Sequence, residues 1–331
     1  MFAFINKKLK ELKHKRLSMN CDIAVSTKDF NIASKQLISK ISCHDLFVAC
    51  LCILDDGRLV SASRDHSIII YNKITFKPDL IIKEHKRSIK YLIKIYKNKL
   101  VSCSDRIRIF KIIDNNYEVA QFLDYHKGSV NKIIELKNNN LVSCSENDND
   151  NSIIFYSKKD DDKYEKYYQI STDDGVDSIV QTKESEICYS IFFKHHTDSI
   201  VFYDLSERKT KKKINGIKHS GFPFNMITKN LLIIGGNDMM FIINVDVYQL
   251  VRKVEIRNHG WYNGFCKLSE NMFLTGGSDG IIRQWEIKGD DISLIYQKEK
   301  AHDGSIYALI RLPNGKIGSS SIDNSIKIWS N

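Results

Sequence analysis

Apolar and polar residues alternate in short runs along this chain, and the runs come in pairs joined by a turn. Four clear pairs are "LVSASRDHSIIIYN" from Leu59, "LVSCSENDNDNSIIFYS" from Leu141, "FLTGGSDGIIRQWEI" from Phe273 and "GSSSIDNSIKIWSN" from Gly318. In each pair, small or hydroxylated residues and an Asp separate the two runs, and the second run leads to an aromatic residue. A period of two on both sides of such a turn predicts a β-hairpin.

The spacing of these hairpins predicts the architecture. The second strands end at seven successive positions, which are Tyr71, Phe110, Tyr156, Tyr203, Asn244, Trp285 and Trp329. Their separations are 39, 46, 47, 41, 41 and 44 residues. Self-similarity at about 40–45 residues, with four strands per unit, is typical of a β-propeller. We therefore predict an all-β fold, a seven-bladed β-propeller of four-stranded antiparallel blades.

The seventh unit supplies only three strands, at about residues 305–311, 316–320 and 325–330. An open edge strand exposes unpaired N–H and C=O groups, so the missing fourth strand must come from elsewhere. The segment "SKQLISKIS", residues 34–42, alternates like a strand but has no partner of its own. We predict that this N-terminal strand completes the last blade, so that the chain can stop at Asn331. The domains are then a leader, residues 1–33, and a propeller, residues 34–331.

The leader carries half of the net charge. Six Lys and Arg residues and one Glu in the first sixteen residues give +5 of a total of +10. In a helix, the apolar residues of this segment lie near one side, opposite a lysine-rich face. These apolar residues are Phe2, Ile5, Leu9, Leu12 and Leu17. A helix docked on the propeller or a partner, a disordered leader and a membrane-surface contact remain alternatives.

The remaining composition restricts the cellular setting. There is no apolar run of 18 or more residues, so we expect no transmembrane segment. The apolar run at the N-terminus is too short to be the core of a secretory signal. The eight cysteines are scattered and mostly lie in apolar runs, which indicates reduced thiols. We therefore expect a cytoplasmic protein, with a nuclear location as the alternative.

A histidine stands upstream of most hairpins at nearly constant distance. His44, His85, His126 and His302 each precede a serine by 17 residues, and His259 precedes Thr275 by 16. The combination His…Ser/Thr-x3-Asp-x5-Trp/Tyr resembles the WD-repeat propeller family, to which the heterotrimeric G-protein β subunit belongs. The resemblance extends over about residues 34–331.

The resemblance implies that these four residue types form a hydrogen-bonded set within a blade. The implied sets are His44, Ser61, Asp65 and Tyr71; His126, Ser143, Asp150 and Tyr156; His259, Thr275, Asp279 and Trp285; and His302, Ser319, Asp323 and Trp329. Phe110 has no hydroxyl group, and its unit has a shorter turn, so the set of the second unit should be incomplete. Because the His and Asp residues recur in place, we interpret them as structural rather than catalytic.

No other motif predicts catalysis, a metal site or a cofactor. "KHHTD" (Lys194–Asp198) and "ENDNDN" (Glu146–Asn151) are interpreted as turns rather than metal-binding loops, because neither has a full ligand pattern. Cys50 and Cys52 are assigned to core packing. A propeller enzyme would need unique acids or nucleophiles around its central channel, and none is recognised. We therefore expect a non-catalytic protein without a cofactor.

The resemblance also implies a partner-binding face, formed by positions shortly after each His and just before each turn Asp. The residues assigned to this top face are Phe47, Arg64, Arg87, Lys90, Phe222, Phe224, Trp261, Tyr262 and Tyr307. Aromatic residues gather on units five to seven and basic residues on units one and two, and both types anchor interfaces. This asymmetry suits an acidic or phosphorylated peptide segment. The alternative is that half of the rings pack between blades.

The expected function is a protein-interaction scaffold or adaptor. One alternative is a substrate receptor of a cullin-RING ubiquitin ligase, because "FLTGGSDGIIRQWEIK" (Phe273–Lys288) resembles the box of such receptors, except for Gln284 at an apolar position. Another alternative is an RNA- or ribosome-associated propeller that uses its basic leader. The fold by itself does not determine the partner.

Overall fold

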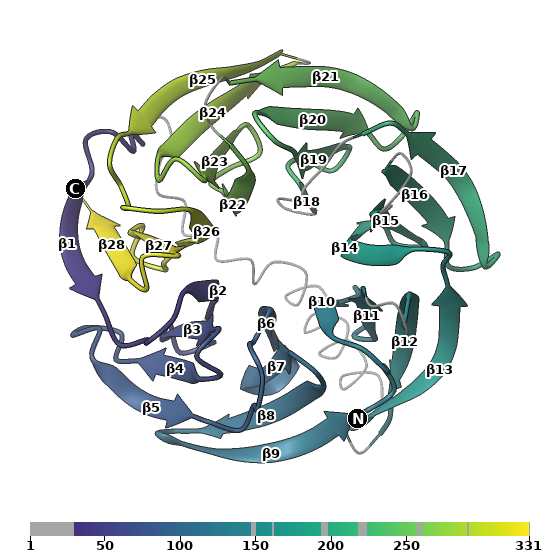
Figure 1. The fold of residues 1–331 in the computed structure, drawn as a ribbon, viewed down its shortest axis with the longest axis horizontal. Coiled ribbons are helices and arrows are strands. Elements are labelled where there is room, and N and C mark those ends of the chain that lie inside the picture. Colours follow the sequence, from purple (N-terminus) through teal and green to yellow (C-terminus); the bar gives the residue numbers. More distant parts are fainter. Residues whose placement is uncertain are drawn as a thin grey trace, which may run out of the picture.

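The computed structural model describes residues 30–146, 150–160, 162–192, 198–217, 224–256, 260–289 and 291–330. In these residues, seven four-stranded antiparallel sheets are arranged as blades in a ring (Figure 1). The predicted seven-bladed β-propeller is confirmed. Among the described residues, no helix is long and apolar enough to cross a membrane. The predicted leader falls almost wholly outside the described residues.

Each blade runs from an inner strand near the ring axis to an outer strand at the circumference. The inner strands are β2 (Val48–Ile53), β6 (Tyr91–Ile95), β10 (Val130–Glu135), β14 (Gly175–Lys183), β18 (Phe224–Met226), β22 (Tyr262–Lys267) and β26 (Ile306–Arg311). The second strands are β3 (Leu59–Ser63), β7 (Lys99–Cys103), β11 (Leu141–Ser145), β15 (Glu186–Phe192), β19 (Leu231–Gly235), β23 (Met272–Gly277) and β27 (Ile317–Ser321).

The other two positions of each blade follow the same order. The third strands are β4 (Ile68–Tyr71), β8 (Ile107–Ile113), β12 (Ser152–Lys158), β16 (Ser199–Asp204), β20 (Met239–Asn244), β24 (Ile282–Lys288) and β28 (Ile326–Ser330). The outer strands are β5 (Pro78–Ile82), β9 (Asn116–Leu123), β13 (Tyr164–Ser171), β17 (Lys209–Asn215), β21 (Gln249–Glu255), β25 (Asp291–Lys298) and β1 (Gln36–Ile41). A short 3₁₀ turn, η2 (Tyr96–Asn98), joins β6 to β7.

The core consists of layers between neighbouring blades, and strand sequences reflect their place in the ring. Strands β3 ("LVSAS") and β4 ("IIIY") are buried at every residue, because other blades cover both of their faces. Outer strand β17 ("KTKKKIN") is exposed at all residues but one. Cys50 and Cys52 belong to the apolar layer between the first two blades. Among the described cysteines, all but Cys43 are buried, and all are free thiols.

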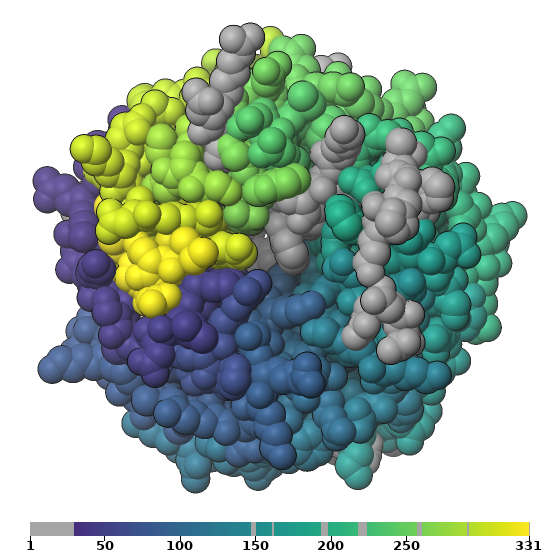
Figure 2. Space-filling model, viewed as in Figure 1, coloured from purple at the N-terminus to yellow at the C-terminus, as the bar shows by residue number. Residues whose placement is uncertain are grey.

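The last blade contains both ends of the described chain. Strand β1 pairs antiparallel with β28, with Leu37 opposite Trp329 and Ile41 opposite Ile326. The purple N-terminal strand therefore lies beside the yellow C-terminal strands in Figures 1 and 2. The predicted closure by an N-terminal strand is confirmed, with the strand at residues 36–41 inside the predicted segment 34–42.

A second contact secures the closure one blade away. The side-chain amide of Gln284, on β24 of the sixth blade, accepts a hydrogen bond from the Ile32 backbone N–H at 2.9 Å. The same amide donates to the Phe30 carbonyl at 2.7 Å. The Ile32 side chain is fully buried in the layer between the sixth and seventh blades. We call residues 30–35 the clasp. Its two backbone contacts with Gln284 explain why a polar residue stands at position 284, where the ligase-receptor box has an apolar one.

Candidate partner-binding site at the channel mouth

The loops that reach the ring axis are positioned by hydrogen-bonded sets. In the seventh blade, His302 Nδ1–H donates to Asp323 Oδ2 at 2.8 Å, and His302 Nε2 accepts from Ser319 Oγ at 2.7 Å. The Trp329 indole N–H donates to the same Oγ at 2.8 Å. Burial alone would raise the pKa of the Asp323 carboxyl, but hydrogen bonds from Ser325 and His302 outweigh it and hold the pKa at about 2. The set therefore joins a loop, a turn and two strands.

Two more sets repeat this geometry with tyrosine in place of tryptophan. Their His–Asp, His–Ser and Ser–Tyr distances are 2.8, 2.6 and 2.9 Å in the first blade and 2.9, 2.7 and 3.0 Å in the third. Their members are His44, Ser61, Asp65 and Tyr71, and His126, Ser143, Asp150 and Tyr156.

The sixth blade shows part of its implied set. Trp285 Nε1 donates to Thr275 Oγ1 at 2.8 Å, and Arg283 pairs with Asp279 at 2.6 Å. His259 lies outside the described residues, so its place in the set stays a prediction.

Replacement of Asp323 by Ala is expected to lower the free energy of unfolding by about 1–3 kcal/mol. The loss leaves the His302 ring N–H and the backbone N–H and hydroxyl of Ser325 without their acceptor. Urea unfolding measures the change, with Asp303→Ala, at an exposed neighbouring carboxylate, as the matched control. Equal stability of the two variants would show that the set does not stabilise the blade.

The second blade has a histidine at the same position, but the donor and acceptor roles of its two ring nitrogens are exchanged. His85 Nε2 lies 2.5 Å from Ser102 Oγ, but its Nδ1 accepts from the Arg108 guanidinium at 2.6 Å. Because Nδ1 is an acceptor here, the proton of the neutral ring is on Nε2, which donates to the serine. Burial, followed by the Arg108 charge, lowers the pKa of His85 to about 3.

The contribution of His85 to the stability of the protein is therefore expected to fall as the pH drops below about 6.5. The unfolded chain protonates His85 near its ordinary pKa of about 6.5, whereas the folded chain does not until about 3. In this window the unfolded state binds more protons, so His85 alone should remove about 2 kcal/mol between pH 6.5 and 5. Urea midpoints at pH 7.5 and 5 measure the slope, and His85→Asn should reduce it. Equal pH slopes in the two proteins would contradict the assignment.

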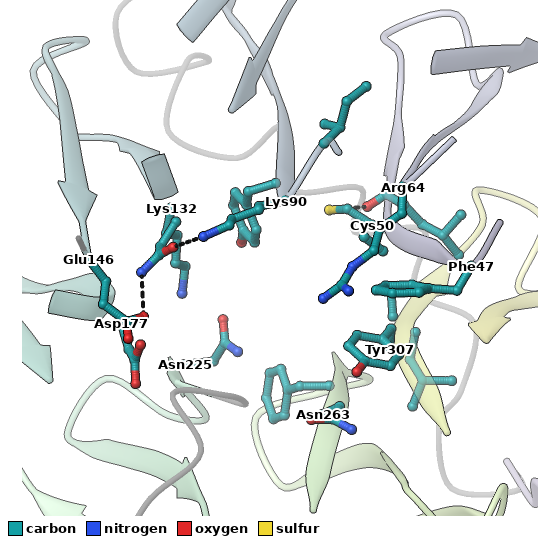
Figure 3. Close-up of a pocket in the computed structure, with 18 residues that line it drawn as sticks. Phe47, Cys50, Arg64, Lys90, Lys132, Glu146, Asp177, Asn225, Asn263 and Tyr307 are labelled. Atoms are coloured by element: carbon teal, nitrogen blue, oxygen red, sulfur yellow. Dashed lines mark hydrogen bonds between the residues drawn. The ribbon is translucent and has the colours of Figure 1, made fainter. Parts of the chain in front are cut away.

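The strands alternate in direction, so the links between blades and the turns between second and third strands share one face of the ring. We call this the top face, and the channel mouth is the cavity that opens there around the axis. The cavity has a volume of about 320 Å³ and is lined by residues from all seven inner strands or their flanking loops (Figure 3).

Irregular pairing in five inner strands aims side chains into this cavity. In β2, β10, β14, β22 and β26 the register with the second strand shifts by one residue near the top face. The residues at these shifts all line the cavity. They are Ala49, Asn131, Asp177, Asn263 and Tyr307. A β-bulge redirects a side chain in this way.

One wall of the cavity is a stack of two rings and a guanidinium group. Phe47 stacks on Tyr307 with ring centroids 4.8 Å apart, and Arg64 Cζ lies 4.1 Å from the Phe47 centroid. In Figure 3 the guanidinium group points toward the open centre. The structure thus brings together three predicted residues from the first and seventh blades.

Lysines of the second and third blades continue the basic wall. Lys90 Nζ donates to Asn131 Oδ1 at 2.6 Å. Lys132 is only 2% exposed, and its ammonium donates to Ser178 Oγ at 3.0 Å and to the Phe224 carbonyl at 3.3 Å. Burial lowers the pKa of Lys132 to about 8. Lys132 was not among the predicted site residues.

Two carboxyl groups that the sequence analysis missed lie across the cavity from Arg64, beside Lys90 and Lys132 (Figure 3). Glu146 Oε2 accepts from Asn131 Nδ2 at 3.2 Å, and Asp177 shares a hydrogen bond with Glu146. Burial and the neighbouring Glu146 raise the pKa of Asp177 to about 8. Glu146 follows Ser143 by three residues, as Arg64 follows Ser61. Counting from the serine, rather than backward from the turn Asp, would have found it.

Two predicted surface aromatics are in the core instead. Phe224 and Tyr262 are both 0% exposed, so their assignment to the top face is wrong. Phe224 packs in the layer between the fourth and fifth blades and Tyr262 in the layer between the fifth and sixth. Both residues begin an inner strand, and the side chain of each packs between two blades. The residues that follow them, Asn225 and Asn263, line the cavity. The alternative of packing between blades applies to them.

Two other predicted residues, Trp261 and Arg87, lie apart from the cavity. Trp261 is 45% exposed and is held by backbone hydrogen bonding with Ser278. Arg87 is exposed on the top face but does not line the cavity. Phe222 lies outside the described residues.

The segments considered for metal binding give no site in the described part of the chain. Residues 147–149 of "ENDNDN" and residues 194–197 of "KHHTD" fall outside the described ranges. Among the residues that are described, no cluster of three or more His, Cys, Asp or Glu side chains is arranged to hold a metal ion.

Comparison with known proteins agrees with this architecture. The family model described as WD domain, G-beta repeat, matches residues 35–72 and 295–330. No curated protein matches the chain. The described part of the chain is a seven-bladed propeller with a cavity lined by charged and aromatic residues at its channel mouth. The two matched stretches meet at the ring closure, and together with the seven-bladed ring they are consistent with a WD-repeat β-propeller.

Proposed function

We propose that this protein is a non-catalytic scaffold or adaptor that binds segments of partner proteins at the channel mouth. The WD-domain match supports a role in protein interaction in general. The observation that carries the specific proposal is the stack of Arg64, Phe47 and Tyr307 at the opening of the cavity. Aromatic and Arg side chains dominate the energetics of interfaces. Stacking holds them in place before a partner arrives, which lowers the entropic cost of binding.

The basic wall favours an acidic or phosphorylated partner segment. Arg64, Lys90 and Lys132 come from three blades and line the same cavity. A carboxylate or phosphate that enters the mouth would be attracted by all three cations, and a partly desolvated site strengthens such pairs. By this proposal the protein acts in the cytoplasm or nucleus.

The alternative functions have less support. Gln284 is fully buried and binds the backbone of the clasp. Gln284, the residue by which this chain departs from the ligase-receptor box, therefore serves a contact within the chain. The basic leader, on which an RNA-binding role depends, lies outside the described residues. We therefore propose the scaffold role alone.

The double variant Arg64→Glu and Tyr307→Ala is expected to reduce recovery of specific partners by about tenfold or more, because each residue type costs over 1 kcal/mol when lost from an interface centre. Quantitative affinity purification from cells compares the partners recovered by the double variant with those recovered by the wild-type protein. Lys229→Glu, at an exposed residue of the β18–β19 hairpin on the opposite face, is the control. If the double variant keeps its melting temperature and recovers the same partners, the channel mouth is not the binding site.

A further inference from the structure

The cavity at the channel mouth has two walls of opposite charge. Arg64 stands on one side and Glu146 and Asp177 on the other, while the Lys90 ammonium lies between them beside Asn131 (Figure 3). The Asn131 amide lies between them, since its oxygen accepts from Lys90 and its nitrogen donates to Glu146. An amide thus spaces the cationic and anionic groups apart within one cavity. An acidic partner segment uses only the first wall.

We infer that the channel mouth binds a dipolar group, with a carboxylate or phosphate at Arg64 and Lys90 and an ammonium or guanidinium at Glu146 and Asp177. In a partner protein, an acidic side chain adjacent to a basic one carries this chemistry. A free amino acid carries it as well. The inference rests on the proposed function, because it specifies the partner segment that enters the same cavity.

The anionic wall is held in place by the backbone beneath it. A Cβ atom at Gly175 would lie 2.3 Å from Glu146 Cγ, so the Glu146 side chain folds over a residue that must lack one. Asp177 occupies the register shift of β14, which aims its carboxyl group into the same cavity. These two features bring two carboxyl groups from different blades together on one side of the cavity.

Electrostatics then favours a ligand that carries both charges. Two adjacent carboxyl groups repel each other when both are ionised, and the raised pKa of Asp177 reflects burial and this repulsion. A ligand cation offsets the repulsion, whereas an anionic ligand without a cation is repelled by the same pair. A purely cationic ligand is likewise repelled by the positive charges of Arg64, Lys90 and Lys132. Only a dipolar ligand matches both walls.

Matched peptides test the inference on the full-length protein. Isothermal titration calorimetry at pH 7.5 compares acetyl-Glu-Lys-amide, acetyl-Glu-Gln-amide and acetyl-Gln-Lys-amide, so that each control peptide replaces one charged side chain by a neutral one. We expect the Glu-Lys peptide to bind about tenfold more tightly than either singly charged peptide, since each added charge-assisted contact contributes to affinity. In a parallel arm, 4-aminobutyrate is compared with succinate and 1,4-diaminobutane. Tighter binding of the peptide than of 4-aminobutyrate assigns the dipole to a partner segment, and the reverse assigns it to a free zwitterion.

Variants assign each charge to its wall. In Glu146→Gln with Asp177→Asn, the Glu-Lys and Glu-Gln peptides should bind equally. In Arg64→Gln, the preference for Glu-Lys over Gln-Lys should fall by about fivefold or more. Glu184→Gln, at an exposed residue of the β14–β15 hairpin on the opposite face, should keep the full preference. Melting temperatures establish that each variant is folded.

The outcomes separate this inference from the proposed function. If the Glu-Gln peptide binds wild-type protein as tightly as Glu-Lys, or if Glu-Lys does not bind at concentrations up to about 10 mM, the dipolar site is wrong. Loss of partners in the Arg64→Glu, Tyr307→Ala purification would still support the scaffold in that case. If that purification is unchanged while the peptide preferences hold, the cavity binds a dipolar ligand without acting as the partner site.

Discussion

Removal of residues 1–41 is expected to abolish cooperative unfolding of the propeller or to cause aggregation. The truncation deletes β1 and the clasp, and so exposes the unpaired edge of β28 together with the apolar layer between the last two blades. Ile32 and Ile41 are 0% and 5% exposed, and burial of two such side chains contributes about 3–6 kcal/mol. This is a large part of the stability of an ordinary domain.

The truncated protein allows a direct test by complementation. A synthetic peptide of residues 30–41 should restore a cooperative urea transition, because it contains every described contact of β1 and the clasp. The same peptide with Ile32→Asp and Ile41→Asp is the matched control and should not restore it. A truncated protein that unfolds at the midpoint of the full chain without any peptide would show that the closure is dispensable.

Replacement of Gly280 by Ala is expected to lower the free energy of unfolding by about 3–5 kcal/mol. Gly280 has a φ of +72°, and a Cβ atom there would lie 2.3 Å from the His302 carbonyl oxygen. The backbone N–H of His302 also donates to the Gly280 carbonyl at 3.0 Å. The methyl group must therefore push the loop that carries His302 and disturb the set of the seventh blade.

Gly315 provides a matched control for this substitution. Its φ is +78°, but no atom lies within 4 Å of the position that a Cβ would take. Gly315→Ala should cost only the conformational strain, about 1–2 kcal/mol. Chemical denaturation of both variants separates backbone strain from steric conflict. Similar losses in the two proteins would mean that the contact between Gly280 and His302 relaxes without cost.

The fold was predictable from sequence because its determinants are local and repeated. Each hairpin carries its own period of two and its own turn, and the interval between hairpins defines a blade. The closure was also predictable, since β27 and β28 needed another strand and residues 34–42 had no other partner. The clasp was not predictable, because the contact between Gln284 and Phe30 joins residues 254 positions apart through a single side chain.

The site was predicted less completely because it depends on strand register. A shift of one residue decides whether a side chain enters the cavity or packs between blades, and alternation alone does not reveal it. Tyr262 and Asn263 illustrate this, since the tyrosine is buried and the asparagine lines the cavity. Glu146 was missed for another reason, since a lengthened turn separates it from Asp150. Asp177 lies in a unit whose repeat is weak.

The pairing of β1 with β28 also sets the order of events when the protein is made. Ser330, opposite Gln36, is synthesised 294 residues later. At about 5–20 residues per second, the first strand waits roughly 15–60 s for its neighbour. During translation the N-terminal strand is thus an unsatisfied edge on a growing chain. The ring can close only after β28 has been made.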